Sequence, residues 1–259
     1  MEQSPLVSVI MPAYNSGAFI SEAIQSVLAQ THTNLELLVI DDASKDNTIE
    51  ITEAFQSKDS RIKLFKNTSN KGAGITRNIG IKEAKGTFIA FLDADDLWLP
   101  EKLNIQLEFM ATHDLAMTFS SYNLMDESGI LLNKKVKALP VLTYQKLLRS
   151  NYVGNLTGIY NVNMLGKIYC PELRKRQDWA LWLTILSKID STKGIEKPLA
   201  NYRIRENSIS KNKTALLKYN YLIYSEFLKY SRLKSLVKMG VFLKEHFFVK
   251  NKQISSLDN

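Results

Sequence analysis

The sequence predicts an α/β fold with a mostly parallel, doubly wound sheet that is flanked by helices. Short apolar runs alternate with segments of helical spacing through the first 92 residues, the order of strands and helices found in such sheets. The runs are almost continuously apolar, as expected for strands covered on both faces. Two of them, residues 35–40 and 87–92, end directly on aspartates, at the edge where open α/β sheets bind ligands.

The first part of the chain is predicted to contain four strands and three helices. The expected strands span residues 6–11, 35–40, 61–66 and 87–92. The expected helices span residues 17–30, 44–55 and 71–84. We expect Pro12 to end the first strand, because proline cannot donate a hydrogen bond to a neighbouring strand.

The second part of the chain has a less regular pattern. Helices are expected at residues 101–113, 143–151 and 178–189, and strands at residues 117–122 and 199–204. From residue 214 to about residue 250 the chain is predicted to be helical, with apolar and basic residues mixed. We expect no transmembrane helix and no signal peptide, because the sequence has neither a long uncharged apolar stretch nor a basic leader.

Composition limits the kinds of site that are possible. Cys170 is the single cysteine, so one chain can form neither a disulfide nor a cysteine-based zinc site, which is typical of a reducing cytosol. The three histidines are too scattered to build a metal site, so any metal is expected to have hard oxygen ligands. Cys170 has no histidine nearby in the sequence, and we interpret it as a packed thiol.

The positive charge is concentrated at the C-terminal end. Residues 211–259 hold ten Lys or Arg and three Asp or Glu, a net charge of +7, which leaves +1 of the total +8 for residues 1–210. This distribution argues against a nucleic-acid-binding body. It favours a basic tail that meets an anionic surface.

The strongest chemical signal is Asp93-Ala94-Asp95, at the end of the fourth expected strand. Two carboxylates that flank one residue can face the same side, and Mn²⁺ or Mg²⁺ prefers such oxygen ligands while leaving room for phosphate. The alternative is a solvated acidic turn. We favour the metal site, because charges at the end of a buried strand need partners.

Other candidate residues follow the remaining strands. Asp42 could accept the imide N–H of uracil or cap the next helix, and Tyr14, after Pro12, could pack against a nucleobase or lie in the core. The segment from Lys71 to Arg77 has glycines at a helix start, where phosphate can approach, or it is a plain helix entry with a solvated arginine.

Asp178 is a candidate general base at the start of an apolar helix. A carboxylate beside a tryptophan can serve as a proton acceptor, although an aspartate at this position is equally typical of a helix N-cap.

Taken together, these motifs resemble family 2 of the glycosyltransferases, which have the Rossmann-like GT-A fold. The matching segments are residues 8–15, 26–31, 39–46, 71–74, 77–78, 91–96, 177–179 and 202–203. The resemblance implies a nucleotide-sugar-binding half over residues 1–110 and an acceptor-binding half over residues 111–210. Residues 211–259 then form a basic amphipathic helical tail.

The resemblance also assigns roles to residues. It implies that Pro12, Tyr14 and Asp42 contact the nucleoside, and that Asp93 and Asp95 serve the ribose, the diphosphate and a Mn²⁺ or Mg²⁺ ion. Lys71, Arg77 and Ala94 complete the expected donor-binding set. Asp178 takes the place of the catalytic base. Gln177 departs from the family's common Glu-Asp pair, and the Q-x-x-R-W motif of processive synthases is absent, which indicates single addition.

The expected enzyme is therefore an inverting, metal-dependent hexosyltransferase that uses a UDP-sugar, with glucose or galactose as the hexose. Its size and tail resemble bacterial enzymes that extend undecaprenyl-diphosphate-linked units of O-antigen or capsule, as peripheral proteins on the cytoplasmic face of the inner membrane. The tail helix either lies on the anionic membrane or packs on the domain. Alternatives are another acceptor, such as an exopolysaccharide or protein glycan, a nucleotidyltransferase that makes nucleotide sugars, or a non-catalytic sugar- or partner-binding domain.

Overall fold

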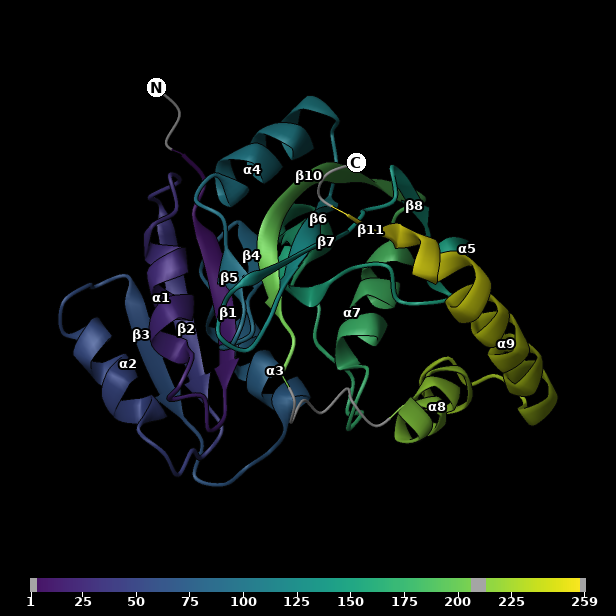
Figure 1. The fold of residues 1–259 in the computed structure, drawn as a ribbon, viewed down its shortest axis with the longest axis horizontal. Coiled ribbons are helices and arrows are strands. Elements are labelled where there is room, and N and C mark those ends of the chain that lie inside the picture. Colours follow the sequence, from purple (N-terminus) through teal and green to yellow (C-terminus); the bar gives the residue numbers. More distant parts are fainter. Residues whose placement is uncertain (1–3, 206–212, 257–259) are drawn as a thin grey trace.

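The computed structural model describes residues 4–205 and 213–256, and its central feature is one mixed sheet with helices on both faces (Figure 1). The main strand order is β11-β7-β6-β9-β4-β1-β2-β3. These strands are β1 Val7–Ala13, β2 Leu35–Asp41, β3 Ile62–Lys66, β4 Phe88–Phe91, β6 Met117–Met125, β7 Leu131–Val136, β9 Ile159–Asn161 and β11 Ile254–Ser256. The α/β prediction is confirmed.

The first half of the sheet is parallel, as predicted. Strands β3, β2, β1 and β4 pair in parallel, and α1 (Ile20–Leu28), α2 (Thr48–Gln56) and α3 (Ala73–Glu83) connect them. Alternate residues of one strand enter opposite cores: Val9 packs in the cluster that contains the buried face of α1, and Ile10 packs in the cluster that contains Ile81 of α3. Both faces are covered, which explains the continuous apolar runs.

Strand β1 was predicted to end at Pro12, but it continues to Ala13. Its pairing with β4 ends at Ile10, whereas its pairing with β2 continues to Ala13. Beyond Ile10, β1 is therefore an edge towards β4. Proline is tolerated there, because no strand on that side needs its N–H.

The second half of the sheet is mixed. Strand β9 pairs antiparallel with β4 and β6, and β10 (Ser191–Arg203) pairs parallel with β6. Two short strands, β5 (Leu97–Trp98) and β8 (Val141–Thr143), pair antiparallel with β10. The strand expected at 199–204 is thus the end of a longer one. Its start was missed because residues 191–198 are largely polar and the pairing shifts register there.

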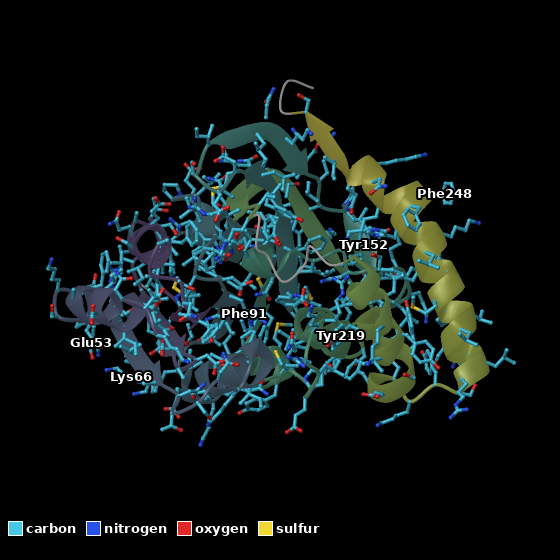
Figure 2. All side chains as sticks on the ribbon, turned by 60° about the horizontal axis from the view of Figure 1, so that its bottom comes forward. Glu53, Lys66, Phe91, Tyr152, Tyr219 and Phe248 are labelled. Carbon is cyan, nitrogen blue, oxygen red and sulfur yellow. The ribbon has the colours of Figure 1, made fainter. Side chains whose placement is uncertain are left out.

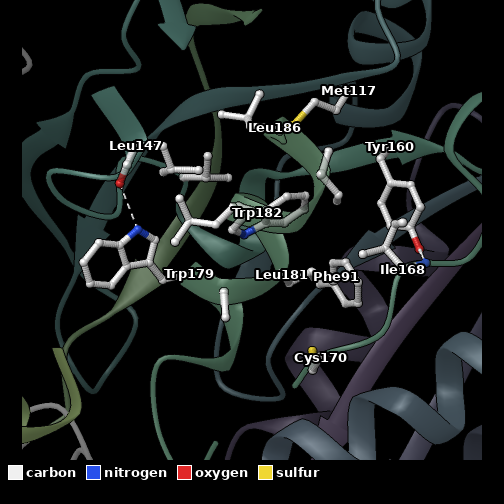
Figure 3. Close-up of a cluster of buried hydrophobic side chains, with 14 of the residues drawn as sticks. Phe91, Met117, Leu147, Tyr160, Ile168, Cys170, Trp179, Leu181, Trp182 and Leu186 are labelled. Atoms are coloured by element: carbon white, nitrogen blue, oxygen red, sulfur yellow. Dashed lines mark hydrogen bonds between the residues drawn. The ribbon is translucent and has the colours of Figure 1, made fainter. Parts of the chain in front are cut away.

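Among the helices of this half, α4 (Lys102–Thr112) matches its prediction, but the helix expected at 143–151 is only the short α5 (Tyr144–Leu147). The helix α7 (Gln177–Leu186) is buried nearly all round, as its apolar sequence predicts. Trp179 donates from Nε1 to the Leu147 carbonyl at 2.9 Å, and Trp182 meets Phe91 edge-on at 5.8 Å (Figure 3). These contacts fix the first turn of α7, which carries Asp178.

The prediction that the C-terminal tail is helical is confirmed, although the helical structure is interrupted once. Helix α8 (Lys213–Leu222) continues into one turn of π-helix at Ile223–Phe227. The helical structure then stops at Lys229, which has a φ of 53°, and α9 (Arg232–Lys244) starts with Ser231 as its N-cap. A second π-turn (Glu245–Val249) and a 3₁₀ turn (Lys250–Gln253) lead into β11. The expectations for residues 206–212 and 257–259 lie outside the described residues.

The tail is joined to the body of the protein. Ile223, Tyr224 and Phe242 are buried in the same core cluster as Trp179, and β11 adds an antiparallel strand beside β7. In Figure 1, α9 lies along the outside of the domain, next to α7 and α8. No helix among the described residues is long and apolar enough to cross a bilayer.

Candidate active site

The carboxyl ends of β1, β2 and β4 bring the first group of predicted residues to one edge of the sheet. Ala13 pairs with Asp41, and Ile10 pairs with Phe91, so the segments that follow the three strands begin side by side. Tyr14 is 47% exposed directly after β1. The exposure of its ring rules out the alternative that Tyr14 is a core residue.

Asp42 is buried and organises the loop before α3. Its Oδ1 accepts hydrogen bonds from Asn67 Nδ2 and from the Lys71 N–H, both at 2.8 Å, and its Oδ2 accepts from the Gly72 N–H at 2.8 Å. The helix-cap interpretation is wrong, because the N-cap residue of α2 is Asn47, and the first N–H of the helix, that of Thr48, donates to Asp46 Oδ1. Asp42 therefore holds the glycine-rich segment against the strand ends.

Asp41 and Asn15 join the first two strand-end loops. The Ser44 N–H donates to Asp41 Oδ2 at 3.0 Å, and the Lys45 N–H donates to Asn15 Oδ1 at 2.8 Å. Asn15 has a φ of 47°, a conformation that asparagine tolerates better than most residues. These bonds keep the loop beside Tyr14 in one shape.

Arg77, on α3, links the glycine-rich segment to Asp93. Its guanidinium is buried rather than solvated, and it forms an ion pair with Asp93 Oδ1 at 2.5 Å. Burial by itself lowers the pKa of Arg77, but the charges of Asp93 and Asp178 raise it above its ordinary value. Arg77 thus stays charged between the predicted donor aspartates and the predicted base.

Asp95 is paired with arginines from the end of β10. Arg205 contacts Asp95 Oδ2 at 3.1 Å, and Arg203 Nε donates to the Asp95 carbonyl at 2.8 Å. Burial raises the pKa of Asp95, and the charge of Asp93 raises it further, whereas Arg205 opposes the shift. Two carboxylates that repel each other in this way would be stabilised by a cation between them.

Arg203 and Asp96 support this turn from beneath, a role that the sequence did not predict for them. The Arg203 side chain is 1% exposed and forms an ion pair with Glu22 at 2.6 Å, and the Arg203 N–H donates to Asp96 Oδ1 at 2.9 Å. Burial raises the pKa of Asp96 well above its usual range, with the charges of Asp95 and Asp93 adding to the shift. The Tyr202-Arg203 motif was the available signal, but its partners are distant in sequence.

Asp178 lies in the first turn of α7, with Asn151 donating from Nδ2 to its Oδ2 at 2.8 Å. The N-cap residue of α7 is Arg176, so Asp178 is not the N-cap. A Cβ at Gly74 would lie 2.8 Å from Gln177 Cγ, so glycine lets α3 approach α7 closely. This approach brings Asp178 within electrostatic range of Arg77.

Cys170 lies beside this junction but has no nucleophilic character. Its side chain is buried, its N–H donates to Asn78 Oδ1 at 2.7 Å, and burial raises the pKa of the thiol to about 11. The thiol is therefore protonated at neutral pH, which agrees with the packed role expected for it.

The carboxylates of Asp93 and Asp95 suit a hard divalent cation whose remaining ligands come from phosphate or water. The described residues contain no group of three or more His, Cys, Asp or Glu arranged to hold a metal ion. Asp93 and Asp95 are 34% and 26% exposed, so both can offer oxygen atoms at the surface. Two carboxylates with phosphate and water oxygens are a common arrangement for Mg²⁺. Such an ion would compete with Arg205 for Asp95.

Comparison with known proteins identifies the family. The model of "Glycosyl transferase family 2" matches residues 8–160, which is more than half of the chain. The chain belongs to glycosyl transferase family 2. This membership decides between the two enzyme classes that the sequence left open, in favour of a glycosyltransferase.

Two relatives of this glycosyltransferase are Escherichia coli enzymes named UDP-Glc:alpha-D-GlcNAc-diphosphoundecaprenol beta-1,3-glucosyltransferase. WfgD is 39% identical over 86% of this chain and 87% of its own length. WfaP is 36% identical over 80% of this chain and 81% of its own length. The structure of Staphylococcus aureus TarS residues 1–349, solved with UDP-GlcNAc, is 24% identical, with a TM-score of 0.71 over 95% of this chain and 74% of that fragment. The structural likeness shows that the fold is GT-A.

Proposed function

We propose that this family 2 enzyme is an inverting glucosyltransferase that moves glucose from UDP-glucose to an undecaprenyl-diphosphate-linked sugar during surface polysaccharide synthesis. The observation that carries the proposal is the position of Asp178, held by Asn151 beside the Arg77–Asp93 ion pair. The names and the 36–39% identities of the two Escherichia coli relatives support glucose and the lipid diphosphate. Galactose is the other expected hexose.

In this proposal residues 1–110 bind the donor and residues 111–210 bind the acceptor. Tyr14, after Pro12, offers an exposed ring for the uracil, and Asp42 shapes the loop that faces the nucleoside. Lys71 lies in that loop, while Ala94 is a small residue that keeps the two donor aspartates apart. Arg77 and the segment Asp93–Asp95 then lie at the diphosphate.

Asp178 is the proposed base for a direct displacement. Asn151 occupies its Oδ2, so Oδ1 is the oxygen that accepts the proton from the acceptor hydroxyl. The deprotonated oxygen attacks the anomeric carbon from the face opposite UDP, a C–O bond forms, and the bond to the diphosphate breaks. One attack from the opposite face inverts the configuration, and the buried positive charge of Arg77 offsets the negative charge that gathers between base and leaving group.

A divalent ion held by Asp93 and Asp95, Mn²⁺ or Mg²⁺, would neutralise charge on the leaving diphosphate. The support for this is the partly exposed carboxylate pair and the raised pKa of Asp95, which partial burial and the charge of Asp93 cause. The residues of the chain would bind the ion, and Arg205 would move from Asp95 to make room.

We also propose that the enzyme lies on the cytoplasmic face of the inner membrane as a peripheral protein. The outer face of the tail, defined here as Leu233, Leu236, Val237, Phe247 and Phe248, is 59–75% exposed. Phe248 points away from the body in Figure 2. Exposed Arg232, Lys234 and Lys244 flank this face, and together they suit an interfacial helix beside anionic lipid.

A transfer assay tests the function. The full chain is incubated with UDP-[¹⁴C]glucose, Mn²⁺ and a synthetic GlcNAc-diphosphate-lipid, and the lipid product is separated and its linkage is determined by NMR. We expect a β-linked disaccharide lipid, and turnover that falls when EDTA is added. UDP-galactose, UDP-GlcNAc and GDP-mannose are compared under the same conditions. A product with retained configuration, or transfer from none of these donors, would contradict the proposal.

A further inference from the structure

A pocket beside Asp178 has no part in the donor-binding edge of the sheet. It has a volume of about 100 Å³ and lies between the first turn of α7 and the C-terminal turns. Its lining comprises Ser150, Asn151, Arg176, Trp179, Phe242 and Lys250, and His246 closes one side. These residues come from three distant parts of the chain. No motif found in the sequence includes Phe242, His246 or Lys250.

Two cations face this pocket. Lys250 donates from Nζ to the Asn151 carbonyl, and Arg176 Nε donates to Asn220 Oδ1 at 2.7 Å. Burial lowers the pKa of Lys250 to about 8, and the charge of Arg176 lowers it further, whereas Asp178 opposes the shift. Burial also lowers the pKa of Arg176. Two positive groups that disfavour each other in one pocket would be stabilised by an anion with several oxygens.

The backbone is strained at Arg176, which lines this pocket. Arg176 has a φ of 67° and a ψ of 18°, the left-handed region that non-glycine residues rarely adopt. Strain of this kind persists only where the surrounding structure enforces it, and it concentrates at ligand sites. The first N–H groups of α7 follow directly and also favour a negative ligand.

The pocket is connected to the predicted base through Asn151. This residue lines the pocket and also donates to Asp178 Oδ2 at 2.8 Å. An anion in the pocket is therefore separated from the base by about the width of one amide side chain. A sugar whose hydroxyl meets Asp178 could place a phosphate on its anomeric oxygen in this pocket.

A series of aromatic rings leads from the pocket to the surface. Trp179 and Phe242 have ring centroids 5.8 Å apart, Phe242 and His246 stack at 5.7 Å, and His246 meets Phe247 edge-on at 5.3 Å. Trp179 is fully buried, whereas Phe247 is 60% exposed and belongs to the outer face of the tail. The pocket is thus connected by packed rings, of which Trp179 and Phe242 are buried, to the face that is proposed to meet the membrane.

From these contacts we propose that the pocket binds the diphosphate of a lipid-diphosphate-linked sugar acceptor, with Lys250 and Arg176 on the phosphate oxygens. The outer rings of the series, His246 and Phe247, then lie along the first part of the lipid. This inference rests on the proposed function, because it gives the acceptor of that reaction its binding site. The donor's diphosphate is assigned to the Arg77 and Asp93 side of Asp178. The two diphosphates would then lie on opposite sides of the base.

The kinetic test compares two acceptors in detergent, so that membrane binding does not contribute. One is GlcNAc linked through a diphosphate to an undecyl chain, and the other is undecyl α-GlcNAc, which lacks the diphosphate. Lys250→Met should raise KM for the diphosphate acceptor at least tenfold and change KM for the neutral glycoside and for UDP-glucose less than twofold. Lys250→Arg should restore most of the affinity. Lys58→Met, which removes an exposed charge near the end of α2, is the matched control.

An equal loss of kcat/KM for both acceptors would show that Lys250 has only a structural role, and unchanged kinetics with the diphosphate acceptor would also overturn the proposal. Arg176→Gln should behave as Lys250→Met does. Circular dichroism melting of each variant identifies any that is unfolded, and such a variant is replaced by its milder partner, Lys250→Gln or Arg176→Lys.

A binding measurement separates this inference from the proposed function. Farnesyl diphosphate is titrated calorimetrically into the enzyme saturated with UDP and Mn²⁺, which blocks the donor site. We expect wild type to bind it and Lys250→Met to bind it at least tenfold more weakly, even if wild type transferred no sugar in the assay above. If inorganic diphosphate bound as tightly as farnesyl diphosphate, the role of the ring series would be refuted. No binding by wild type would refute the pocket itself.

Discussion

The edge of the sheet that is proposed to bind the donor and the pocket beside α7 are built in different ways. At the donor edge, the carboxylates stand at or just after the ends of strands, and Asp42 accepts from the backbone N–H groups of Lys71 and Gly72. Asp93 and Asp95 instead form ion pairs with arginine side chains. The pocket instead takes Asn151, Arg176 and Lys250 from a loop, a strained helix start and the last helical turn. The carboxylates of the donor edge can be located in the sequence from the strand ends, whereas the residues of the pocket belong to no such local pattern.

This difference determines how visible each region is in the sequence. The donor edge is determined by strand positions, so its residues appear as compact motifs. The pocket beside α7 lies between the body of the protein and the tail, and its residues appear in no compact motif. The following experiments test that contrast, in order of decreasing effect.

Asp178 should be needed for chemistry and not for donor binding. Asp178→Asn keeps the size of the side chain but removes the proton acceptor, so we expect kcat to fall by about 10³ or more. Calorimetry should find UDP binding within threefold of wild type. Asp190→Asn, at an exposed site after the same helix, is the control. Near-normal turnover of Asp178→Asn would show that Asp178 is not the base, and the donor edge and the pocket would then share no catalytic residue.

Asp95 should act on the donor side alone. Asp95→Asn removes a charge from the carboxylate pair, and we expect UDP binding in Mn²⁺ to weaken about 100-fold, because a metal held by one carboxylate is bound poorly. Titration with Mn²⁺ and UDP measures the loss. The affinity for farnesyl diphosphate should stay unchanged. Asp114→Asn, in an exposed loop, serves as the comparison, and full metal-dependent binding by Asp95→Asn would contradict the assignment.

Asp42 should affect the affinity for UDP-glucose by holding the loop before α3 in place. Asp42→Ala leaves three donors, the Asn67 amide and the N–H groups of Lys71 and Gly72, without their acceptor. We expect KM for UDP-glucose to rise more than about tenfold and the melting temperature to fall, because buried unpaired N–H groups are costly. Kinetics and thermal melting measure both effects. A lower melting temperature with an unchanged KM would make Asp42 purely structural.

The tail should bind membrane through its outer face rather than as a detachable arm. Because Tyr224 and Phe242 are core residues, deletion of the tail would unfold the protein, and surface changes are the better test. Leu236→Glu with Phe248→Glu should weaken sedimentation with phosphatidylglycerol vesicles about tenfold, since two apolar side chains no longer enter the interface. Ile130→Glu, at a residue of similar exposure outside the tail, is the control. Equal pelleting would refute the membrane face.

Lys102 offers a contrast to Lys250, because both are buried lysines but only one lines the pocket. Lys102 is fully buried in α4, donates to Gln106 Oε1, and burial lowers its pKa to about 7. The unfolded chain therefore binds more protons between about pH 7 and pH 10, so the free energy of unfolding rises with pH across that window, by up to about 1.4 kcal/mol per unit.

Replacing Lys102 with Met should remove this contribution to the pH dependence and raise the stability slightly at pH 7. Urea unfolding at pH 7 and pH 9 measures the difference in slope between wild type and Lys102→Met. The KM for the diphosphate acceptor should stay unchanged. An altered KM would mean that any buried lysine affects acceptor binding, and would weaken the case for Lys250.

The sequence by itself determined the parallel half of the sheet and the residues at its edge. Short apolar runs that end on Asp41 and Asp93 can form few structures other than buried parallel strands, because both faces must be covered and the charges must reach the surface. The burial of α7 also followed from its composition. The roles of the edge residues in catalysis stay predictions until the experiments above are done.

The tertiary structure decided what lies between distant segments. The antiparallel strands of the second half, the break at Lys229, and the support of Asp95 by Arg203 depend on pairings that leave weak local patterns. The excess of positive charge in the tail was visible in the sequence. The hydrogen bond from Lys250 to the Asn151 carbonyl, beside the proposed base, was not. The reason is physical: a contact between residues about 100 apart has no periodicity along the chain, and only the packing of the whole core brings them together.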